Sequence, residues 1–252
     1  MTNLFRSGVV AVSLLALAGC SGVGFRADTG GVEAINSVAI VSFVVPEFVM
    51  EKAESGGLSG VTALISVGKK VASGEKATGN GQQVAQTAAE GFAQTMAQDT
   101  KKTFVPMATV TGNAQFQALA TEYGKTGTKY MAAPGLPVIL LEMKTKHSDF
   151  AAKAAKALGV DGVVIVFTRE LEYALYTGAM GTGEAKAEGS GLFIMFDRDG
   201  NAVWESGTVV RSEASAAMVA GALDPRKAET LHKDIGATMA KDLWATYTKE
   251  TK

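Results

Sequence analysis

The chain of 252 residues is 47% hydrophobic and 19% charged, and its 24 Lys and Arg nearly balance its 25 Asp and Glu, giving a formal net charge of −1. That apolar fraction excludes a largely disordered chain, and the balanced charge argues against a general nucleic-acid binder. With a single Cys and two His, the chain can form neither an internal disulfide nor a Cys- or His-rich zinc site.

The first nineteen residues are typical of a secretory signal peptide. One cation, Arg6, precedes an uncharged apolar run from Val9 to Leu17, and small residues follow the run. This run is well short of the roughly 20 apolar residues that a membrane-spanning helix needs. We therefore expect residues 1–19 to be a cleaved leader.

The leader ends in a motif around the one cysteine. Leu17, Ala18 and Gly19 lead directly into Cys20. This run resembles the lipobox of bacterial lipoproteins, which implies cleavage before Cys20 and acylation of its thiol. Acyl chains would anchor the protein on a membrane, since each buried methylene contributes about 0.8 kcal/mol. Ser21 follows rather than an Asp, which in the sorting rule of diderm bacteria implies an outer-membrane, periplasm-facing location. The alternative is an ordinary signal peptide with an incidental cysteine.

The mature chain is predicted to have a tether and one folded domain. Residues 20–36 contain several Gly, Ser and Asp and predict a lipidated flexible tether. We expect a single α/β periplasmic domain over 37–252, with a Gly- and Ser-rich insertion at 46–82. Within it, apolar residues from Leu58 to Val71 fall near helical spacing and predict a short helix, packed on its own domain or open to a partner.

The first half of the domain starts with the strongest strand signal of the chain. Val38 to Val45 is β-branched and apolar, which predicts a central strand buried on both faces. Residues 82–102 predict a helix, because an apolar residue recurs at every fourth position from Val84 to Met96. The weaker predictions that follow are a strand at 104–110, a helix from Asn113 to Leu119, a loop at 124–135 and a strand at 136–141, with Pro137 near its start or at a sheet edge.

The second half predicts a helix, a three-stranded meander and a closing helix. In chain order these are a helix from Ser148 to Gly159, a strand over 162–175, a turn at 178–183, a strand over 186–196, a hairpin turn at 197–201, a strand over 202–212 and a helix that starts at Asp224–Pro225 and buries Ala228, Leu231, Ile235, Met239 and Leu243. This order predicts an α+β fold (an α/β layer sandwich) with a mixed sheet and a C-terminal three-stranded meander flanked by helices.

Two segments of this half carry a resemblance. They are AKALGVDGVVIV at 155–166 and FDRDGNAVWESG at 196–207. The pattern resembles the periplasmic fold shared by the amino-terminal domain of the Tol-system translocation protein, the curli secretion-channel lipoprotein, lipoprotein activators of penicillin-binding proteins, and exopolysaccharide-export and flagellar-ring accessory proteins. With strand 38–45 and helix 82–102, the likeness spans most of 37–250. It implies binding or assembly and carries over no catalytic residue.

The signature residues have physical roles that can be stated without the family. Gly159 permits a tight passage from helix to strand, and Asp199 and Gly200 supply turn positions with positive φ. Trp204 is predicted to bury its ring against the last helix.

A curli-type pore is disfavoured by charge and length. A lipid-crossing strand needs about 9–11 alternating residues. The hairpin around 178–183 instead carries Glu170 and Glu172 on one strand and Lys186 and Glu188 on the other.

No catalytic, cofactor-binding or metal-binding residue is predicted. His147 and His232 have no nucleophile at a recognisable spacing, so surface roles are the simpler interpretation. Glu170 and Glu172 share one strand face and could form a hydrolytic carboxylate pair, but two solvated side chains are the plainer account.

The sequence therefore predicts a non-enzymatic, lipid-anchored accessory or scaffold protein of a secretion, polysaccharide-export, flagellar or cell-wall assembly. Its expected partners are the membrane, through Cys20, and an envelope protein or copies of itself, with no nucleic acid and no small-molecule substrate. The alternatives are a pore subunit and, less favoured, a hydrolase with an unrecognised carboxylate site.

Overall fold

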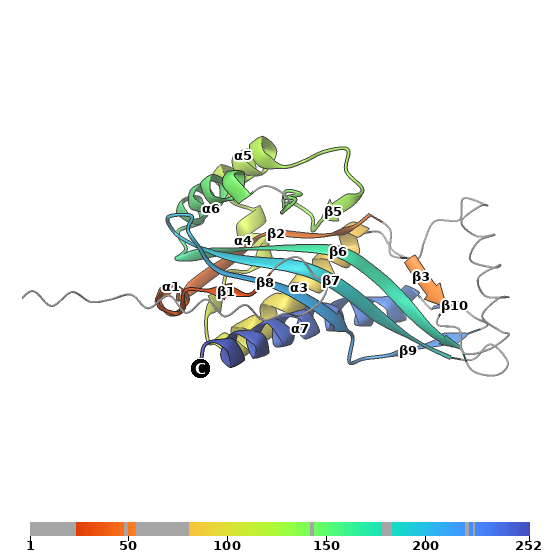
Figure 1. The fold of residues 1–252 in the computed structure, drawn as a ribbon. Helices are drawn as coiled ribbons and strands as arrows, with labels where there is room; N and C mark the ends of the chain where they lie inside the picture. Colours follow the sequence, from red (N-terminus) through yellow and green to blue (C-terminus); the bar gives the residue numbers. More distant parts are fainter. Residues whose placement is uncertain are drawn as a thin grey trace, which may run out of the picture.

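A computed structural model describes residues 24–47, 50–53, 81–141, 144–177, 183–219, 222–223 and 225–252 (Figure 1). The helices in these residues are α1 (Thr29–Ala34), α3 (Gly81–Thr100), α4 (Met107–Thr111), α5 (Ala114–Tyr123), α6 (Lys144–Leu158) and α7 (Pro225–Glu250). The strands are β1 (Arg26–Ala27), β2 (Ser37–Pro46), β3 (Met50–Ala53), β4 (Thr103–Phe104), β5 (Tyr130–Ala132), β6 (Gly162–Thr177), β7 (Gly183–Asp197), β8 (Ala202–Arg211), β9 (Ala216–Val219) and β10 (Ala222–Leu223).

The strands form one mixed sheet, which confirms the predicted fold class. The order along the sheet is β1-β8-β7-β6-β2-β4. β6, β7 and β8 pair antiparallel as the predicted meander, and β2 pairs parallel with β6. β2 is therefore not the central strand that its apolar run predicted. Val38 to Val45 are nevertheless all buried, because helices cover both faces of the sheet there.

Helices cover the two faces of the sheet unequally. Figure 1 shows α3 and α7 side by side on one face, and α4, α5 and α6 on the other. Backbone contact at two glycines brings α3 and α7 close: a Cβ on Gly236 would lie 2.0 Å from the carbonyl oxygen of Ala88, and one on Gly91 2.1 Å from that of Lys233. The predicted stripe of α7, from Ala228 to Leu243, is buried as expected.

The predicted helices that lie within the described residues are confirmed, with changes at their ends. Asn113 caps α5, because its side chain accepts a hydrogen bond from the amide of Phe116. α6 begins at Lys144, one turn before the predicted start at Ser148. α7 begins at Pro225, whereas its predicted capping partner Asp224 lies outside the described residues.

Two predicted strands are wrong. Of the predicted strand 104–110, only Phe104 lies in a strand, as the second residue of β4, and after Pro106 the chain turns into α4. The predicted strand at 136–141 does not form, although Leu136 and Ile139 are buried. The backbone of this segment bonds instead to the hydroxyl of Ser42, which donates to the carbonyl of Pro137 and accepts from the amide of Ile139. The predicted loop at 124–135 contains the short strand β5.

The predicted tether is also wrong over its second half. β1 pairs with β8, and α1 follows with Val32 buried. The ordered domain therefore begins before Arg26 rather than at Ser37. Most of the predicted insertion, with its short helix at 58–71, and the turn at 178–182 lie outside the described residues.

Candidate functional site

The predicted lipidation site lies outside the described residues, because the described chain starts at Gly24. Cys20 and the lipobox residues Leu17, Ala18 and Gly19 therefore remain predictions. The structure does describe how the chain that follows enters the folded domain.

The chain that enters the domain is held by polar contacts at the carboxyl end of α1. The ammonium of Lys102 donates to the carbonyl of Val32, 2.7 Å away, and to that of Ile35. Burial lowers the pKa of Lys102, and the nearby carboxylates of Glu33 and Asp161 oppose that effect. Two carbonyls at the end of α1 thus gain a charged donor.

The start of β2 is held by one carboxylate. Asp161 accepts hydrogen bonds from the amides of Asn36 and Ser37 at 3.2 and 3.0 Å and from the Ser37 hydroxyl at 2.9 Å. These bonds, led by the one from the Ser37 amide, lower the pKa of Asp161 because they favour the charged carboxylate. The chain from Arg26 to the start of β2 is therefore held in place by hydrogen bonds.

The glycines of the fold signature are confirmed. Gly159 has φ +67° at the end of α6, and Gly200 has φ +84° in the β7–β8 turn, where a Cβ would lie 2.2 Å from the carbonyl of Ser148. Asp199 does not have positive φ, so its predicted role is wrong. The residue that organises the turn is Asp197, whose carboxylate accepts from the amides of Asp199 and Asn201 at 2.9 and 2.8 Å.

Trp204 packs against the last helix, as predicted. It is fully buried, and its ring centroid lies 4.6 Å from that of Phe193 in β7. In α7, the ring of Tyr247 lies 4.9 Å away and that of Trp244 6.3 Å away. This aromatic cluster joins β8 to α7 and so fixes the position of β8 in the fold.

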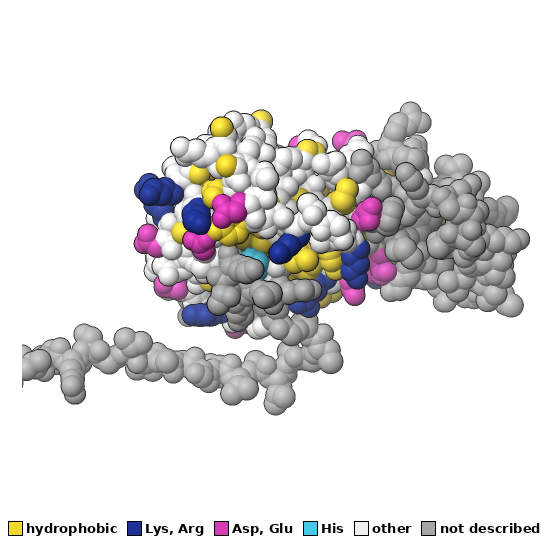
Figure 2. Space-filling model, turned by 90° about the horizontal axis from the view of Figure 1, so that it is seen from above, with side chains coloured by type: hydrophobic (Ala, Val, Ile, Leu, Met, Phe, Trp, Pro, Cys, Tyr) yellow, Lys and Arg dark blue, Asp and Glu magenta, His cyan; other side chains and the backbone are white. Residues whose placement is uncertain are grey.

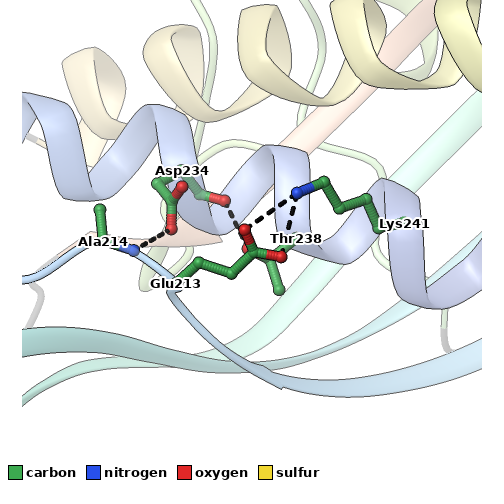
Figure 3. A network of polar contacts seen from close by, with 5 residues as sticks. All are labelled: Glu213, Ala214, Asp234, Thr238 and Lys241. Carbon is green, nitrogen blue, oxygen red and sulfur yellow. Dashed lines mark hydrogen bonds and ion pairs between the residues drawn. The ribbon is translucent and has the colours of Figure 1, made fainter.

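The end of β8 is joined to α7 by a polar network (Figure 3). The amide of Ala214 donates to the carboxylate of Asp234 at 2.9 Å, and the ammonium of Lys241 lies 3.0 Å from the carboxylate of Glu213. The hydroxyl of Thr238 donates to the backbone carbonyl of Asp234. The hydrogen bond with Glu213 raises the pKa of Lys241. The segment that leaves β8 is thereby held on the helix at two successive residues.

The face of β6, β7 and β8 that points away from α7 carries a charged hollow, which we name the acidic trough. Thr208 bonds to Asp242 of α7, so its neighbour Val209 projects from the opposite face. The trough has a volume of about 280 Å³ and is lined by Glu170, Glu172, Glu188, Ser190, Val209 and Arg211. Sequence reasoning placed Glu170 and Glu172 on one face but missed Glu188 as the direct cross-strand neighbour of Glu172.

The charges in the acidic trough are partly compensated. The guanidinium of Arg211 forms an ion pair with Glu188 and lies 5.4 Å from the ring of Tyr176. Glu170 accepts a hydrogen bond from Ser190 at 3.4 Å. At the rim, Val209 is 73% exposed, the largest exposure of any bulky apolar side chain in the described residues.

The charge on the face shown in Figure 2 is mixed. There, coloured Lys and Arg side chains lie beside Asp and Glu, with no stripe of one sign among the described residues of that face. Within the described residues, His, Cys, Asp and Glu form no group of three able to hold a metal ion. No helix among the same residues is long and apolar enough to cross a membrane.

Comparison with known proteins gives weak likenesses only. No family model matches the chain, and no curated protein matches it. Among solved structures, the LpoB C-terminal domain from Salmonella enterica is 12% identical, with 69% of this chain and 82% of that chain covered and a TM-score of 0.22. Lipoprotein GNA1162 from Neisseria meningitidis is 14% identical, with 69% and 81% covered and a TM-score of 0.28. A PelC dodecamer from Paraburkholderia phytofirmans is 12% identical, with 86% and 94% covered and a TM-score of 0.29. These TM-scores are too low for any inference about this chain to rest on them.

Proposed function

We propose that this chain is a lipoprotein of the bacterial envelope, held on a membrane by acyl chains on Cys20, and that it serves as an accessory or scaffold protein for an envelope assembly. The observation that carries the proposal is the position of the one cysteine. Cys20 lies directly behind an apolar leader and only six residues before the first strand of the folded domain. Ser21 favours an outer-membrane location that faces the periplasm.

A docking role agrees with the surface that the sheet presents. The acidic trough and the exposed Val209 lie on strands that Trp204 and the network around Asp234 fix to α7. A rigid surface binds with a smaller loss of conformational entropy than a mobile one. The resemblance of residues 155–166 and 196–207 to binding and assembling proteins points in the same direction. The expected partner is an envelope protein or a second copy of this chain.

The anchor is tested on the native product. Mass spectrometry of the amino-terminal peptide is expected to show a chain that starts at Cys20 and carries fatty acyl groups. Cys20→Ser should leave an unprocessed precursor, whereas Ser21→Ala should be processed and sorted as the natural chain is. Ser21→Asp should move the protein from the outer-membrane to the inner-membrane fraction. An unmodified Cys20 still joined to its leader would end the proposal.

The docking surface is tested by photo-crosslinking in intact cells. A photoreactive amino acid at Val209, in the rim of the acidic trough, is expected to capture one defined protein or a second copy of the chain. The matched control is the same amino acid at Lys249 near the end of α7, whose side chain is 82% exposed. Capture at neither position, or the same products at both, would contradict a docking role for the trough.

A further inference from the structure

The outer edge of β2 is open between its two short partners. β4 pairs with the start of β2, and β5 pairs with its end. On this outer side the carbonyl of Val38 accepts from the amide of Val105 at 2.8 Å, and the carbonyl of Phe43 accepts from the amide of Ala133. The pairing with β4 stops there, because Pro106 follows Val105 and leads into α4.

Ile40 lies on this open stretch of β2, and its backbone groups point outward. Successive residues of a strand point their peptide groups to opposite sides, so Val38 faces β4, Ala39 faces β6 and Ile40 faces outward again. The register shift between Ile40 and Ser42 adds one residue, which is why Phe43 also faces outward. Among the described residues, no backbone group bonds to Ile40 on that side. Ile40 is only 5% exposed, and a buried peptide group without a protein partner indicates a bound water or ligand.

A hollow opens beside Ile40, which we name the edge pocket. Its volume is about 260 Å³, far more than the roughly 30 Å³ that each water occupies in the liquid. Besides Ile40, its apolar walls are Ala93 and Ala97 of α3 and Phe104, Val105 and Met107 of the segment that leads from β4 into α4. These five side chains are half-buried, so the walls can be reached from solvent. The edge pocket therefore has room for a large apolar side chain.

The rim of the edge pocket is acidic. Among the described residues that line it, Glu90 carries the only charge, and Gln86 donates to its carboxylate at 3.2 Å. A second hollow, between α3 and α7, shares Glu90 with the edge pocket and adds Glu229, Lys233 and Asp234. Three carboxylates thus lie near one ammonium among these described residues. The charge complement of this surface is a cationic group.

We propose that the edge pocket binds an extended peptide segment of a partner protein, in which an apolar residue lies next to a Lys or an Arg. One residue of the segment exchanges two backbone hydrogen bonds with Ile40. The apolar side chain fills the pocket, and the cation lies toward Glu90 and α7. Main-chain hydrogen bonds to a sheet edge give affinity in this mode of binding, and the side-chain pocket gives specificity. The site is three strands away from β8 and needs no acyl group on Cys20, so it is independent of the proposed function.

Capped dipeptides test the proposal by NMR. The protein is the ¹⁵N-labelled chain from residue 20 onward with Cys20→Ser, which contains every described residue. The probes are the N-acetyl methylamides of Leu-Lys, Leu-Glu and Ser-Lys. We expect the Leu-Lys probe to shift the amide resonance of Ile40. Its dissociation constant should be at least about threefold below that of Leu-Glu, because of the carboxylates, and at least about tenfold below that of Ser-Lys, because of the apolar walls.

Two variants separate the charge from the pocket. Glu90→Gln removes the carboxylate at the rim and should bring the Leu-Lys and Leu-Glu probes within about twofold of each other. Ala97→Met places a larger side chain in the pocket and should abolish the shift at Ile40. The matched control is Ala108→Met at an exposed position of α4, which should bind the Leu-Lys probe as the natural sequence does.

Every other result overturns the proposal. No shift at Ile40 with the Leu-Lys probe would mean that water alone occupies the pocket. An equal response to the three probes would mean nonspecific contact, and a response centred on Glu188 and Arg211 would assign the probe to the acidic trough. A shift of Ile40 with protein concentration, without a probe, would give the site to a second copy of the chain. If Ala97→Met fails to fold, Glu90→Gln still decides, because the Glu90 side chain is exposed.

Discussion

His232 makes the stability of this fold depend on pH in a predictable direction. The predicted surface position of His232 is wrong, as is that of His147: both side chains are buried, and 5% of the surface of His232 is exposed. One ring nitrogen of His232 contacts the hydroxyl of the fully buried Tyr173 of β6. The other ring nitrogen, Nδ1, has no hydrogen-bond partner among the described residues. A protonated imidazole would need an acceptor at both nitrogens, so the folded state favours the neutral form. Burial accordingly lowers the pKa of His232 from 6.5 to about 4.

The magnitude follows from linkage between protonation and folding. As the pH falls below 6.5, the unfolded chain takes up a proton at His232 that the folded chain does not bind until about pH 4. The free energy of unfolding therefore decreases across this window and is unaffected by His232 above it. One pKa unit corresponds to about 1.36 kcal/mol, so the full shift corresponds to about 3 kcal/mol.

The test compares His232→Gln with the natural chain. The glutamine side chain can keep a hydrogen bond to Tyr173 but does not titrate. Urea unfolding at several pH values between 7 and 4 should show a decline in the natural chain that exceeds the decline in the variant by about 3 kcal/mol. His147, whose pKa burial also lowers, contributes with the same sign, so His147→Gln is the matched control for the second histidine. Parallel stability curves for the natural chain and His232→Gln would refute the reasoning.

Three further predictions concern contacts that hold the domain together. Gly236→Ala should destabilise the fold by about 3 kcal/mol in urea unfolding, because its Cβ would lie 2.0 Å from a carbonyl of α3, whereas Gly30→Ala, whose nearest contact would be 3.7 Å, should have little effect. Trp204→Ala should cost about 3–5 kcal/mol and weaken the near-UV circular dichroism, and an unchanged midpoint would contradict the packing seen here. Lys102→Met should speed amide exchange in α1 at least tenfold while α7 exchanges as before, since the lost bonds to the carbonyls of Val32 and Ile35 are worth on the order of 1–3 kcal/mol.

The elements that sequence reasoning located correctly have local signals. The burial of β2 follows from a run that is apolar except for one Ser and rich in β-branched residues, and the start of α5 follows from the capping residue Asn113. The β7–β8 turn follows from Gly200, which alone can supply its backbone conformation without strain. In each case the decisive residues lie within one element.

The errors arise where distant residues decide the local structure. α1 has six residues and a weak apolar pattern, and its order depends on Lys102 and on pairing of β1 with a strand almost 180 residues away. Residues 136–141 are apolar enough for a strand, but Pro137 lacks an amide donor, and the hydroxyl of Ser42 bonds to the carbonyl of Pro137 and the amide of Ile139 instead of a strand partner. An apolar segment can therefore pack into the core without pairing with a strand of the sheet.

Only part of the acidic trough could be predicted from the sequence. Alternation placed Glu170 and Glu172 on one face, but the partners Glu188 and Arg211 depend on the register of three strands. That register shifts at a bulge between Thr168 and Glu170, which no residue in the segment marks. Val209 likewise reads as a core residue, and its exposure follows only from the absence of a covering helix above β8 among the described residues.

β8 connects the proposed anchor to the proposed docking surface. Its first residues pair with β1, Trp204 holds its core face on α7, Val209 opens into the trough, and the segment after Arg211 is bonded to Asp234. The strand that pairs with the start of the folded chain thus also carries the rim of the trough. Because β8 is held on α7 both through Trp204 and through the segment after Arg211, a partner docked at Val209 would keep a constant position relative to β1, where the chain enters the domain.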